Sequence, residues 1–294
     1  MKIATSAYKP LWHEDWAPLQ ARLDHWIGGA AAGGARLALF PEYAGCEAAL
    51  LGAPQGDPAP KAWRDRMAEV ADRYAAMVSS LAQKHGIYVL AGSLCARDAE
   101  AGFVNRAYLC GPEGGLSWQD KLILTPYERE KMEISPGAEL KCFDTALGRV
   151  GILICYDSEF PLLARRLVEE GVDLILVPSA TDYPAGQTRV RQSCRARAIE
   201  SQCLIVQAPV LGGAAGCDIL DLGTGRAAAF SPPDHGLPSD GIIAQGDTDV
   251  EGWVIFEADP AQIASPRKGG QVGNVAHWPE QDERLANVSI LQVT

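Results

Sequence analysis

The feature that most constrains the fold is a continuous apolar run that ends at a cysteine. Residues 150–155 read Val-Gly-Ile-Leu-Ile-Cys, and a polar turn then leads to Pro161 and a helical pattern over 162–170. A run without polar alternation is typical of a parallel strand covered on both faces. Pro161 suits the first turn of a helix. We therefore expect Cys155 at the carboxyl end of a strand, where open α/β sheets bind ligands.

Cys155 in that position is a candidate nucleophile, because exposure and the positive end of a helix both favour the thiolate. The alternative is a buried structural thiol, which is the commonest fate of a free cysteine. This residue alone does not separate the two interpretations.

Two further segments place a carboxylate and an ammonium at the edges of apolar strands. Glu42 follows the run Leu37-Ala-Leu-Phe-Pro41, and Lys121 precedes the run 122–124. A carboxylate near a thiol can take its proton, and an ammonium can stabilise the oxyanion that then forms. With Cys155 they make the set that amide hydrolysis without a histidine base requires. Each alone is more often a solvated rim residue.

The chain resembles the nitrilase superfamily of carbon–nitrogen hydrolases along most of its length. Phe40-Pro41-Glu42, Asp120-Lys121-Leu122 and 155–161 are similar to its three catalytic blocks, in the family's order. Supporting strings lie at 135–137, 173–180 and 197–202. The resemblance implies an α/β fold of the four-layer αββα sandwich type. It also implies a single domain over residues 1–294.

The resemblance assigns roles to the three candidate catalytic residues. Cys155 is expected to be the nucleophile, and Glu42 the group that accepts and returns its proton. The Lys121 ammonium is expected to hold the oxyanion together with the backbone N–H of Tyr156. Thiol, carboxylate and ammonium cover the reaction, so we expect no metal and no organic cofactor.

Family members often carry a second glutamate shortly after the lysine. Glu128 is our choice, and Glu130 and Glu133 are close enough in sequence to remain alternatives. Loops 45–60 and 180–186 are expected to shape the pocket. The candidate substrate contacts are Tyr127, Thr181 and Tyr183.

Other polar residues of the motifs receive structural interpretations. Asp157 and Glu159 are predicted to cap the helix that follows the cysteine. Arg197 and Glu200 are predicted to form a buried or interface ion pair. The cysteines other than Cys155 are interpreted as core thiols, with Cys46 the one that could lie near the site.

The order of elements indicates an α/β protein. Helices are predicted at 16–27, 63–85, 162–170 and 189–201, and Gly86 suits the end of the second. Residues 269–278 are interpreted as an extended C-terminal tail. Strands are predicted at 37–41, 88–91, 106–110, 142–144, 150–155, 174–177, 203–207, 227–231, 242–244 and 253–256.

Composition excludes several classes of function. The formal charge of −11 and the absence of a basic run argue against a nucleic-acid partner. No apolar stretch approaches the roughly 20 residues that span a bilayer, and the first residues do not resemble a signal peptide. The eight cysteines form no CxxC pair and the five histidines lack the spacing of zinc ligands, which argues against a zinc site. The cytoplasm is the expected location.

The residues after the nucleophile favour one reaction among those of the superfamily. Nitrilases usually have Trp-Glu there and carbamoyl hydrolases an arginine-containing string, whereas this chain has Tyr156-Asp157 followed by Phe160-Pro161. That pattern is closer to amidase-like members, so a small linear amide is the expected substrate. An N-carbamoyl amine hydrolase or a nitrilase is the alternative enzyme, and a non-catalytic scaffold is a more distant one. The resemblance implies a homodimer or larger assembly, with 189–201 and 269–278 near the interface.

Overall fold

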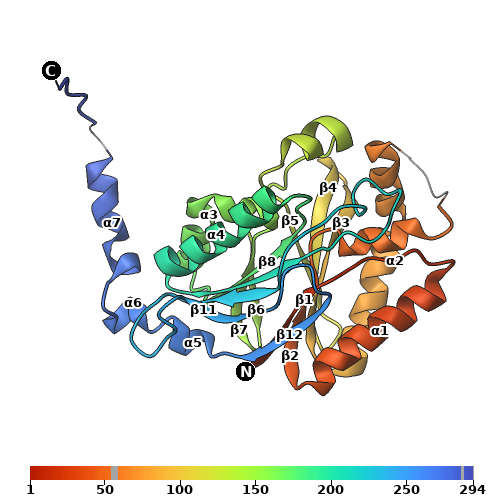
Figure 1. Cartoon of the computed structure of the whole chain (residues 1–294), viewed down its shortest axis with the longest axis horizontal. Helices are drawn as coiled ribbons and strands as arrows, with labels where there is room; N and C mark the ends of the chain where they lie inside the picture. Colours follow the sequence, from red (N-terminus) through yellow and green to blue (C-terminus); the bar gives the residue numbers. More distant parts are fainter. Residues whose placement is uncertain (54–58, 286–287, 294) are drawn as a thin grey trace.

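The computed structural model describes residues 1–53, 59–285 and 288–293. Two six-stranded sheets pack face to face within these residues, as Figure 1 shows. Helices α1 and α2 cover the outer face of one sheet, and α3 and α4 cover that of the other. The predicted four-layer αββα sandwich is therefore confirmed.

The first sheet has the strand order β12–β1–β2–β3–β4–β5. Strands β1, β2 and β3 are parallel, and β12, β4 and β5 join them in antiparallel pairings. The strands are β1 (Lys2–Ala7), β2 (Ala35–Leu39), β3 (Tyr88–Asp98), β4 (Gly102–Cys110), β5 (Leu116–Asp120) and β12 (Gly252–Glu257).

The second sheet repeats this plan with the order β11–β10–β9–β8–β7–β6. Its parallel centre is β7, β8 and β9, again with antiparallel strands on both sides. The strands are β6 (Cys142–Thr145), β7 (Gly148–Ile152), β8 (Leu174–Ser179), β9 (Leu204–Pro209), β10 (Ala228–Phe230) and β11 (Ile242–Gln245).

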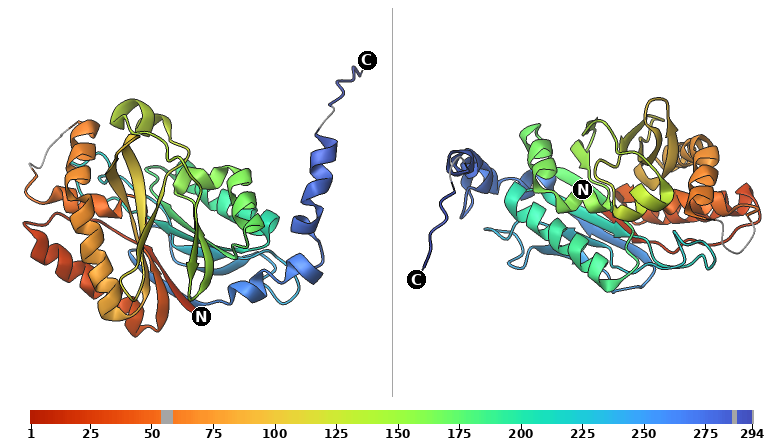
Figure 2. Two further views of the ribbon diagram at one scale, coloured as in Figure 1. Left: turned by 180° about the vertical axis from the view of Figure 1, so that it is seen from behind. Right: turned by 90° about the horizontal axis from the view of Figure 1, so that it is seen from above.

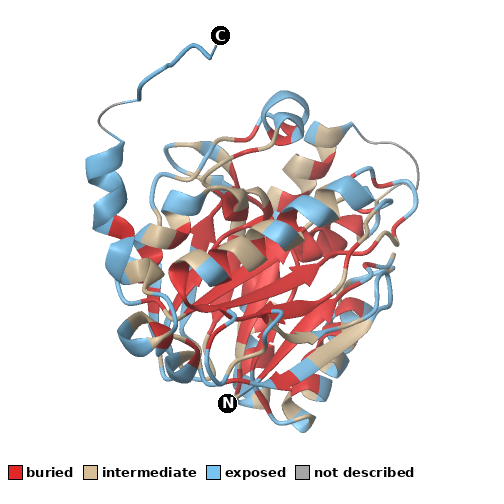
Figure 3. Ribbon diagram, turned by 60° about the vertical axis from the view of Figure 1, so that its left-hand side comes forward, coloured by how far each residue is buried: buried red, intermediate tan, exposed pale blue. Residues whose placement is uncertain are grey.

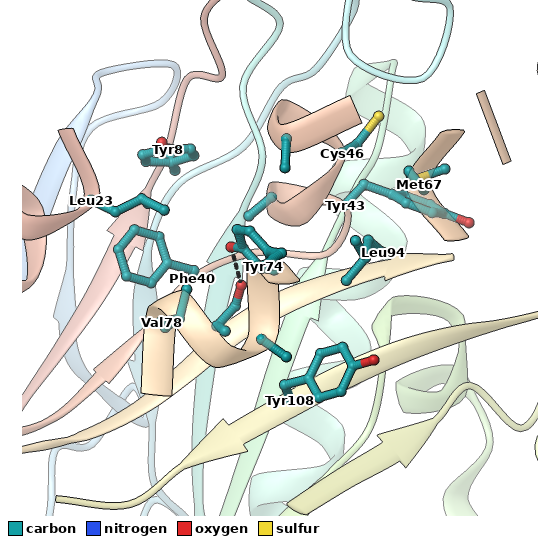
Figure 4. Packing of buried hydrophobic residues seen from close by; sticks show 14 of the residues in the cluster. Tyr8, Leu23, Phe40, Tyr43, Cys46, Met67, Tyr74, Val78, Leu94 and Tyr108 are labelled. Atoms are coloured by element: carbon teal, nitrogen blue, oxygen red, sulfur yellow. Dashed lines mark hydrogen bonds between the residues drawn. The ribbon is translucent and has the colours of Figure 1, made fainter. Parts of the chain in front are cut away.

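The apolar runs of the central strands arise because both faces of each sheet are covered. Along β2, Leu37 and Leu39 belong to the core between the two sheets. Ala38 and Phe40 point the other way and pack with residues of α1 and α2, in the core that Figure 4 shows in part. Alternate residues of a strand face opposite sides, so all positions from Leu37 to Phe40 need an apolar or small side chain, whereas Arg36 at the start of β2 is exposed.

Seven helices lie among the described residues. They are α1 (Trp16–Ala32), α2 (Pro60–His85), α3 (Pro161–Glu169), α4 (Pro184–Ser201), α5 (Pro260–Ile263), α6 (Pro266–Gly269) and α7 (Asn274–Arg284). Short helices of other types lie at or just after candidate residues: the 3₁₀ helix η1 (Ala44–Leu50), the π-helical turn η2 (Glu128–Met132) and the 3₁₀ turn η3 (Cys155–Glu159).

Helix α1 continues past Ile27, where the sequence predicted its end. The pair Gly28-Gly29 lies inside the helix, although glycine is a poor helix former. A Cβ at Gly28 would lie 3.0 Å from the ring of His85 at the end of α2. The glycine therefore allows the two helices to pack closely, and this tertiary contact outweighs its low propensity.

The prediction of an extended tail from residue 269 is wrong for most of that segment. Residues 274–284 form α7, and the Trp278 side chain is 7% exposed. The Arg165 guanidinium of α3 lies 5.2 Å from the Trp278 ring centre. This packing stabilises a helix that has Pro279 within it. Figures 2 and 3 show α7 and the exposed residues 288–293 extending along one side of the molecule and beyond it. No helix in the described part of the chain is long and apolar enough to cross a membrane.

Candidate active site

Glu42 follows β2 in a sharp turn that is built by close backbone approach. Tyr43 adopts the left-handed conformation with φ 57°, and its N–H donates to the Ser93 hydroxyl. Gly92, at φ 71°, passes so close that a Cβ on it would lie 2.1 Å from the Pro41 carbonyl oxygen. The turn directs Glu42 into the interior, where its side chain is 2% exposed.

Lys121 follows β5 and is also buried. Its Nζ lies 2.8 Å from Glu42 Oε1 and 2.7 Å from Glu128 Oε2. Its backbone N–H donates to the Asn105 carbonyl on β4, which fixes where the lysine leaves the sheet. One ammonium thus bridges two buried carboxylates.

Of the three alternatives for a second glutamate, the structure places Glu128 beside the lysine. Glu128 begins η2, and its Oε2 accepts hydrogen bonds from the Thr125 N–H and hydroxyl. Glu130 is exposed, and Glu133 is exposed and paired with Lys61. The π-helical turn therefore directs the first of these glutamates inward and the other two to solvent.

Cys155 lies just after β7, at the start of η3. Its φ is 47°, in the left-handed region that few non-glycine residues occupy. Its Sγ is 3.5 Å from the Ala180 carbonyl oxygen, which follows β8. Strained backbone of this kind is concentrated at functional sites. The thiol projects from the second sheet toward carboxylates held by the first.

The sequence predicted that Asp157 caps α3, but its side chain does not do so. Its Oδ1 accepts from the Ile123 N–H at 2.8 Å and its Oδ2 from the Ile154 N–H at 3.1 Å. The side chain thus ties the segment after Lys121 to the turn that holds the cysteine. Burial raises the pKa of Asp157 to about 7, against the opposing effects of Lys121 and these N–H donors.

The other structural interpretations have mixed outcomes. Glu159 lies 3.4 Å from Arg189 and provides no side-chain cap to α3. The predicted ion pair of Arg197 and Glu200 is present, at 3.0 Å. Arg197 also donates to the Ser158 carbonyl, so α4 supports the cysteine turn.

Two polar contacts in the centre of the site were not predicted. Asn105 of β4 donates its amide N–H groups to Glu42 Oε1 at 2.9 Å and to Glu128 Oε1 at 3.1 Å. The Tyr43 hydroxyl donates to Glu128 Oε1 at 2.8 Å. The signal for Asn105 is its place as an amide within an otherwise apolar, inward-facing strand pattern. Tyr43 directly follows a candidate catalytic residue.

The charges of the site act on one another at close range. Burial raises the pKa of Glu42, and the Glu128 charge adds to that rise against the opposing Lys121 ammonium. Burial opposes ionisation of Glu128, but the ammonium and the Thr125 donors hold its pKa below the usual value. Burial also opposes the charge on Lys121, yet the two carboxylates keep the pKa of the ammonium well above its usual value.

The surroundings of Cys155 favour the neutral form of its thiol. Burial raises the pKa of the Cys155 thiol well above its usual value, and the Glu42 charge raises it further. Lys121 acts in the opposite direction. A thiol in this state reacts only when a nearby base removes its proton. Glu42 is a carboxylate that lines the same cavity and interacts with the thiol.

A cavity of about 320 Å³ opens beside the thiol and the three charged side chains. The candidate contacts Tyr127, Thr181 and Tyr183 all line it. Tyr127 donates its hydroxyl to Asp218 at 2.7 Å, and Thr181 donates to the Thr224 carbonyl. The remaining lining residues include Tyr43, Thr125, Tyr156, Glu159, Ala180, Asp182, Ala185, Gly186, Arg189, Val190, Asp218 and Ile219.

The cysteines other than Cys155 do not line this cavity, and Cys142 is exposed, so its interpretation as a core thiol is wrong. Cys46 is fully buried and does not line this cavity. Of loop 45–60, residues 54–58 lie outside the described residues. No group of three or more His, Cys, Asp and Glu side chains suited to a metal ion occurs in the parts of the chain that the structure describes.

Comparisons with known proteins identify the family of the chain. Residues 2–232 match the family model described as Carbon-nitrogen hydrolase. The chain is 33% identical to the Probable hydrolase YhcX of Bacillus subtilis over 207 residues, 70% of this chain and 40% of that protein. It is 31% identical to the deaminated glutathione amidase of Yersinia enterocolitica over 46% of this chain and 51% of that one. The chain thus spans about half the length, or less, of these curated relatives.

Solved structures share the fold at low sequence identity. Nit3 of Saccharomyces cerevisiae, a member of the nitrilase superfamily, has a TM-score of 0.71 at 22% identity, with 91% of this chain and 93% of that chain covered. An amidase from Nesterenkonia sp. has a TM-score of 0.71 at 20% identity, with 97% and 96% covered. Since the family model covers residues 2–232, most of the sequence, the chain belongs to the carbon-nitrogen hydrolase family.

Proposed function

We propose that this chain hydrolyses the C–N bond of a small linear carboxamide to a carboxylate and ammonia, through a thioester on Cys155. The observation that carries the proposal is the arrangement of thiol, carboxylate and ammonium around one cavity. Glu42, Lys121 and Cys155 all line it, together with Glu128. These groups provide a nucleophile, a base and a cation for the oxyanion within a few ångströms.

In the acylation step, Glu42 takes the proton of the thiol as sulfur attacks the amide carbonyl carbon. The carbonyl π bond opens, and its electron pair moves to oxygen. Two N–H groups of the Lys121 ammonium donate to the carboxylates, and the third is the one that would donate to the oxyanion. The Tyr156 N–H, at the open start of η3, is the proposed second donor.

Collapse of the tetrahedral intermediate requires a protonated nitrogen. Glu42 returns its proton to the amide nitrogen, the C–N bond breaks and ammonia leaves. Glu42, again ionised, then takes a proton from water as the water oxygen attacks the thioester. The C–S bond breaks, the carboxylic acid leaves, and Glu42 gives the proton it took from water to the sulfur, which restores the resting site. The raised pKa of Glu42 suits a group that must act as base and acid in turn.

The proteins similar to this chain support the choice of amides. One relative is the omega-amidase of Mus musculus, 30% identical over 45% of this chain and 50% of that protein. The Nesterenkonia amidase has been solved as a variant with an acetamide moiety attached covalently to its active-site cysteine, at 21% identity and a TM-score of 0.69. The cavity of about 320 Å³ lies at the small end of the range for small-molecule sites, which supports a small substrate.

The test is mass spectrometry of the intact protein after mixing with a panel of small amides, nitriles and N-carbamoyl amino acids. The expected result is an acyl adduct on Cys155 from an amide, with ammonia release that disappears in Cys155→Ala. Ammonia release that survives this substitution would overturn the proposal. Carbon dioxide release from a carbamoyl compound, without turnover of amides, would replace it with the carbamoyl hydrolase.

We also propose a homodimer formed through α4 and the segment from α6 to α7. The supporting observation is that apolar side chains on and beside these helices are exposed in one chain. They include Leu162, Ile199, Val272 and Leu285. Light scattering at micromolar concentration is expected to give twice the mass of the chain. A monomer mass would contradict the assembly and leave the proposed chemistry untouched.

A further inference from the structure

Asn105 occupies an unusual position between the two buried carboxylates. It is fully buried in β4, and its single amide nitrogen donates to Glu42 and to Glu128. Its own Oδ1 has no hydrogen-bond partner among the described residues. Burying an unpaired acceptor costs free energy. The amide is therefore costly to the fold at this position, and its benefit must lie in the two contacts of its nitrogen.

The contacts of Glu42 distinguish its two oxygens. Oε1 accepts from Lys121 Nζ at 2.8 Å and from Asn105 Nδ2 at 2.9 Å, which occupy both of its lone pairs. Oε2 accepts from the Ala180 N–H at 2.9 Å and keeps one lone pair.

The Ala180 residue links Oε2 to the nucleophile. Its N–H donates to Glu42 Oε2, and its carbonyl oxygen lies 3.5 Å from the Sγ of Cys155. The oxygen with a remaining lone pair is therefore the one on the side of the thiol, and the saturated oxygen is on the side of Asn105.

We propose that Asn105 is a positioning residue that makes Oε2 the proton-accepting atom of Glu42 and keeps that carboxylate ionised. The inference rests on the proposed function, since it assigns an atom to the base of that mechanism. In the step concerned, the S–H bond of Cys155 breaks, an O–H bond forms at Oε2, and the electron pair stays on sulfur. Asn105 itself touches no reacting atom.

Removal of this donor has a defined consequence. A hydrogen bond to a carboxylate favours its ionised form, so losing the bond raises the pKa of the acid. Without the amide, Glu42 and Glu128 would also repel each other with only Lys121 between them. Glu42 would then ionise at higher pH, and deprotonation of the thiol would follow the same shift.

The experiment is the rate of Cys155 alkylation by iodoacetamide as a function of pH, measured on the Cys155 peptide by mass spectrometry. It needs no knowledge of the substrate. Alkylation forms the S–C bond and releases iodide. The acid limb, the low-pH part of the plot of alkylation rate against pH, reports the ionisation of Glu42. The variants are Asn105→Ala, Asn105→Ser as a smaller disturbance, and Glu42→Gln.

A matched control is Gln119→Ala. Gln119 is a fully buried amide on the neighbouring strand β5, and it donates to the Asp120 and Glu139 carbonyls rather than to the site. Loss of either buried amide should lower the stability of the protein, but only loss of Asn105 should change the pH at which Glu42 ionises.

In either folded Asn105 variant, the midpoint of the acid limb is expected to lie about one pH unit higher than in the wild type. In Gln119→Ala the midpoint is expected at the wild-type pH. An unshifted limb in a folded Asn105 variant would overturn the inference, whatever the stability of that variant. If Glu42→Gln keeps the wild-type limb, Glu42 is not the base, and the proposed mechanism itself fails.

Discussion

Two buried glutamates, five positions apart in the sequence, are equally hidden from solvent but have different surroundings. Glu42 and Glu47 both lie after β2, and both are almost completely excluded from solvent. Each is surrounded by hydrogen-bond donors, as buried carboxylates must be. Glu47 accepts from the Tyr8 hydroxyl, from the His13 ring at 2.7 Å and from the Leu11 N–H at 3.0 Å.

The difference lies in what is adjacent to each carboxylate. Glu42 lines the cavity that also contains the Cys155 thiol, and its donors come from β4, from the residue after β5 and from the loop after β8. Glu47 does not line that cavity, and the three donors named above come from residues 8–13. It holds the segment after β1 against η1. Burial and hydrogen bonding alone therefore do not single out a candidate catalytic carboxylate. The open cavity and the thiol beside Glu42 are what distinguish it from Glu47.

The largest expected effect is on activity in Glu42→Gln. The amide keeps the shape of the side chain but cannot accept the thiol proton, so kcat should fall by about 10²–10⁴-fold. Ammonia release measures this, and thermal unfolding checks that the protein remains folded. A decrease of less than about tenfold would remove Glu42 from the role of base.

The second largest effect is expected when the ammonium that bridges the two carboxylates is removed. Lys121→Met removes the proposed oxyanion donor, and kcat should fall by about 10²–10³-fold. Since the ammonium holds down the pKa of Glu42, its loss should also move the acid limb of the rate profile to higher pH. Lys131→Met, at an exposed position of η2, is the control and should leave both quantities unchanged. An unmoved acid limb in folded Lys121→Met would contradict the assigned coupling.

The third effect should fall on stability and spare the chemistry. Glu47→Gln weakens a charge-assisted network that joins residues 8–13 to η1, so the free energy of unfolding should fall by about 1–3 kcal/mol. Denaturant unfolding measures this change. The kcat of the folded variant should stay within about threefold of the wild type. A loss of activity as large as that of Glu42→Gln would mean that the two glutamates are not functionally distinct.

The smallest expected effect is a shift in the pH at which kcat/KM of the wild-type protein falls. Burial raises the pKa of Glu42 above its usual 4.5, and the base must be ionised to act, so kcat/KM should fall with decreasing pH at a midpoint above 4.5. Glu47→Gln should show the same midpoint. A wild-type midpoint at or below 4.5 would mean that Lys121 outweighs burial at this carboxylate.

Local sequence patterns predicted much of the fold and indicated where the site would form. The helical stripe from Trp63 to His85 and the glycine after it are present as α2 and its left-handed cap at Gly86. The apolar runs are strands because both sheet faces are covered. The C-terminal helix α7 was missed, because Pro279 and nearby glycines disfavour a helix and its stability depends on Trp278 packing against α3.

Contacts between distant segments could not be predicted in the same way. Asp157 was assigned to the nearest helix, whereas its partners include Leu122 and Ile123, more than thirty residues earlier. Asn105 had no local pattern of a catalytic motif around it. The left-handed conformation of Cys155 is imposed by the turn between β7 and α3, and nothing in its own side chain favours it.

By itself, the sequence determined the alternation of strands and helices, the family and the three residues Glu42, Lys121 and Cys155 as candidates. These follow from hydrophobic periodicity and from short motifs, which are local properties of the chain. Only the tertiary structure decided which second glutamate faces the lysine, which oxygen of Glu42 accepts from the Ala180 N–H, and which buried carboxylate lies beside a cavity. Proton affinity and reactivity depend on burial and on distances of about 3 Å between residues from separate strands and loops, and folding alone sets those distances.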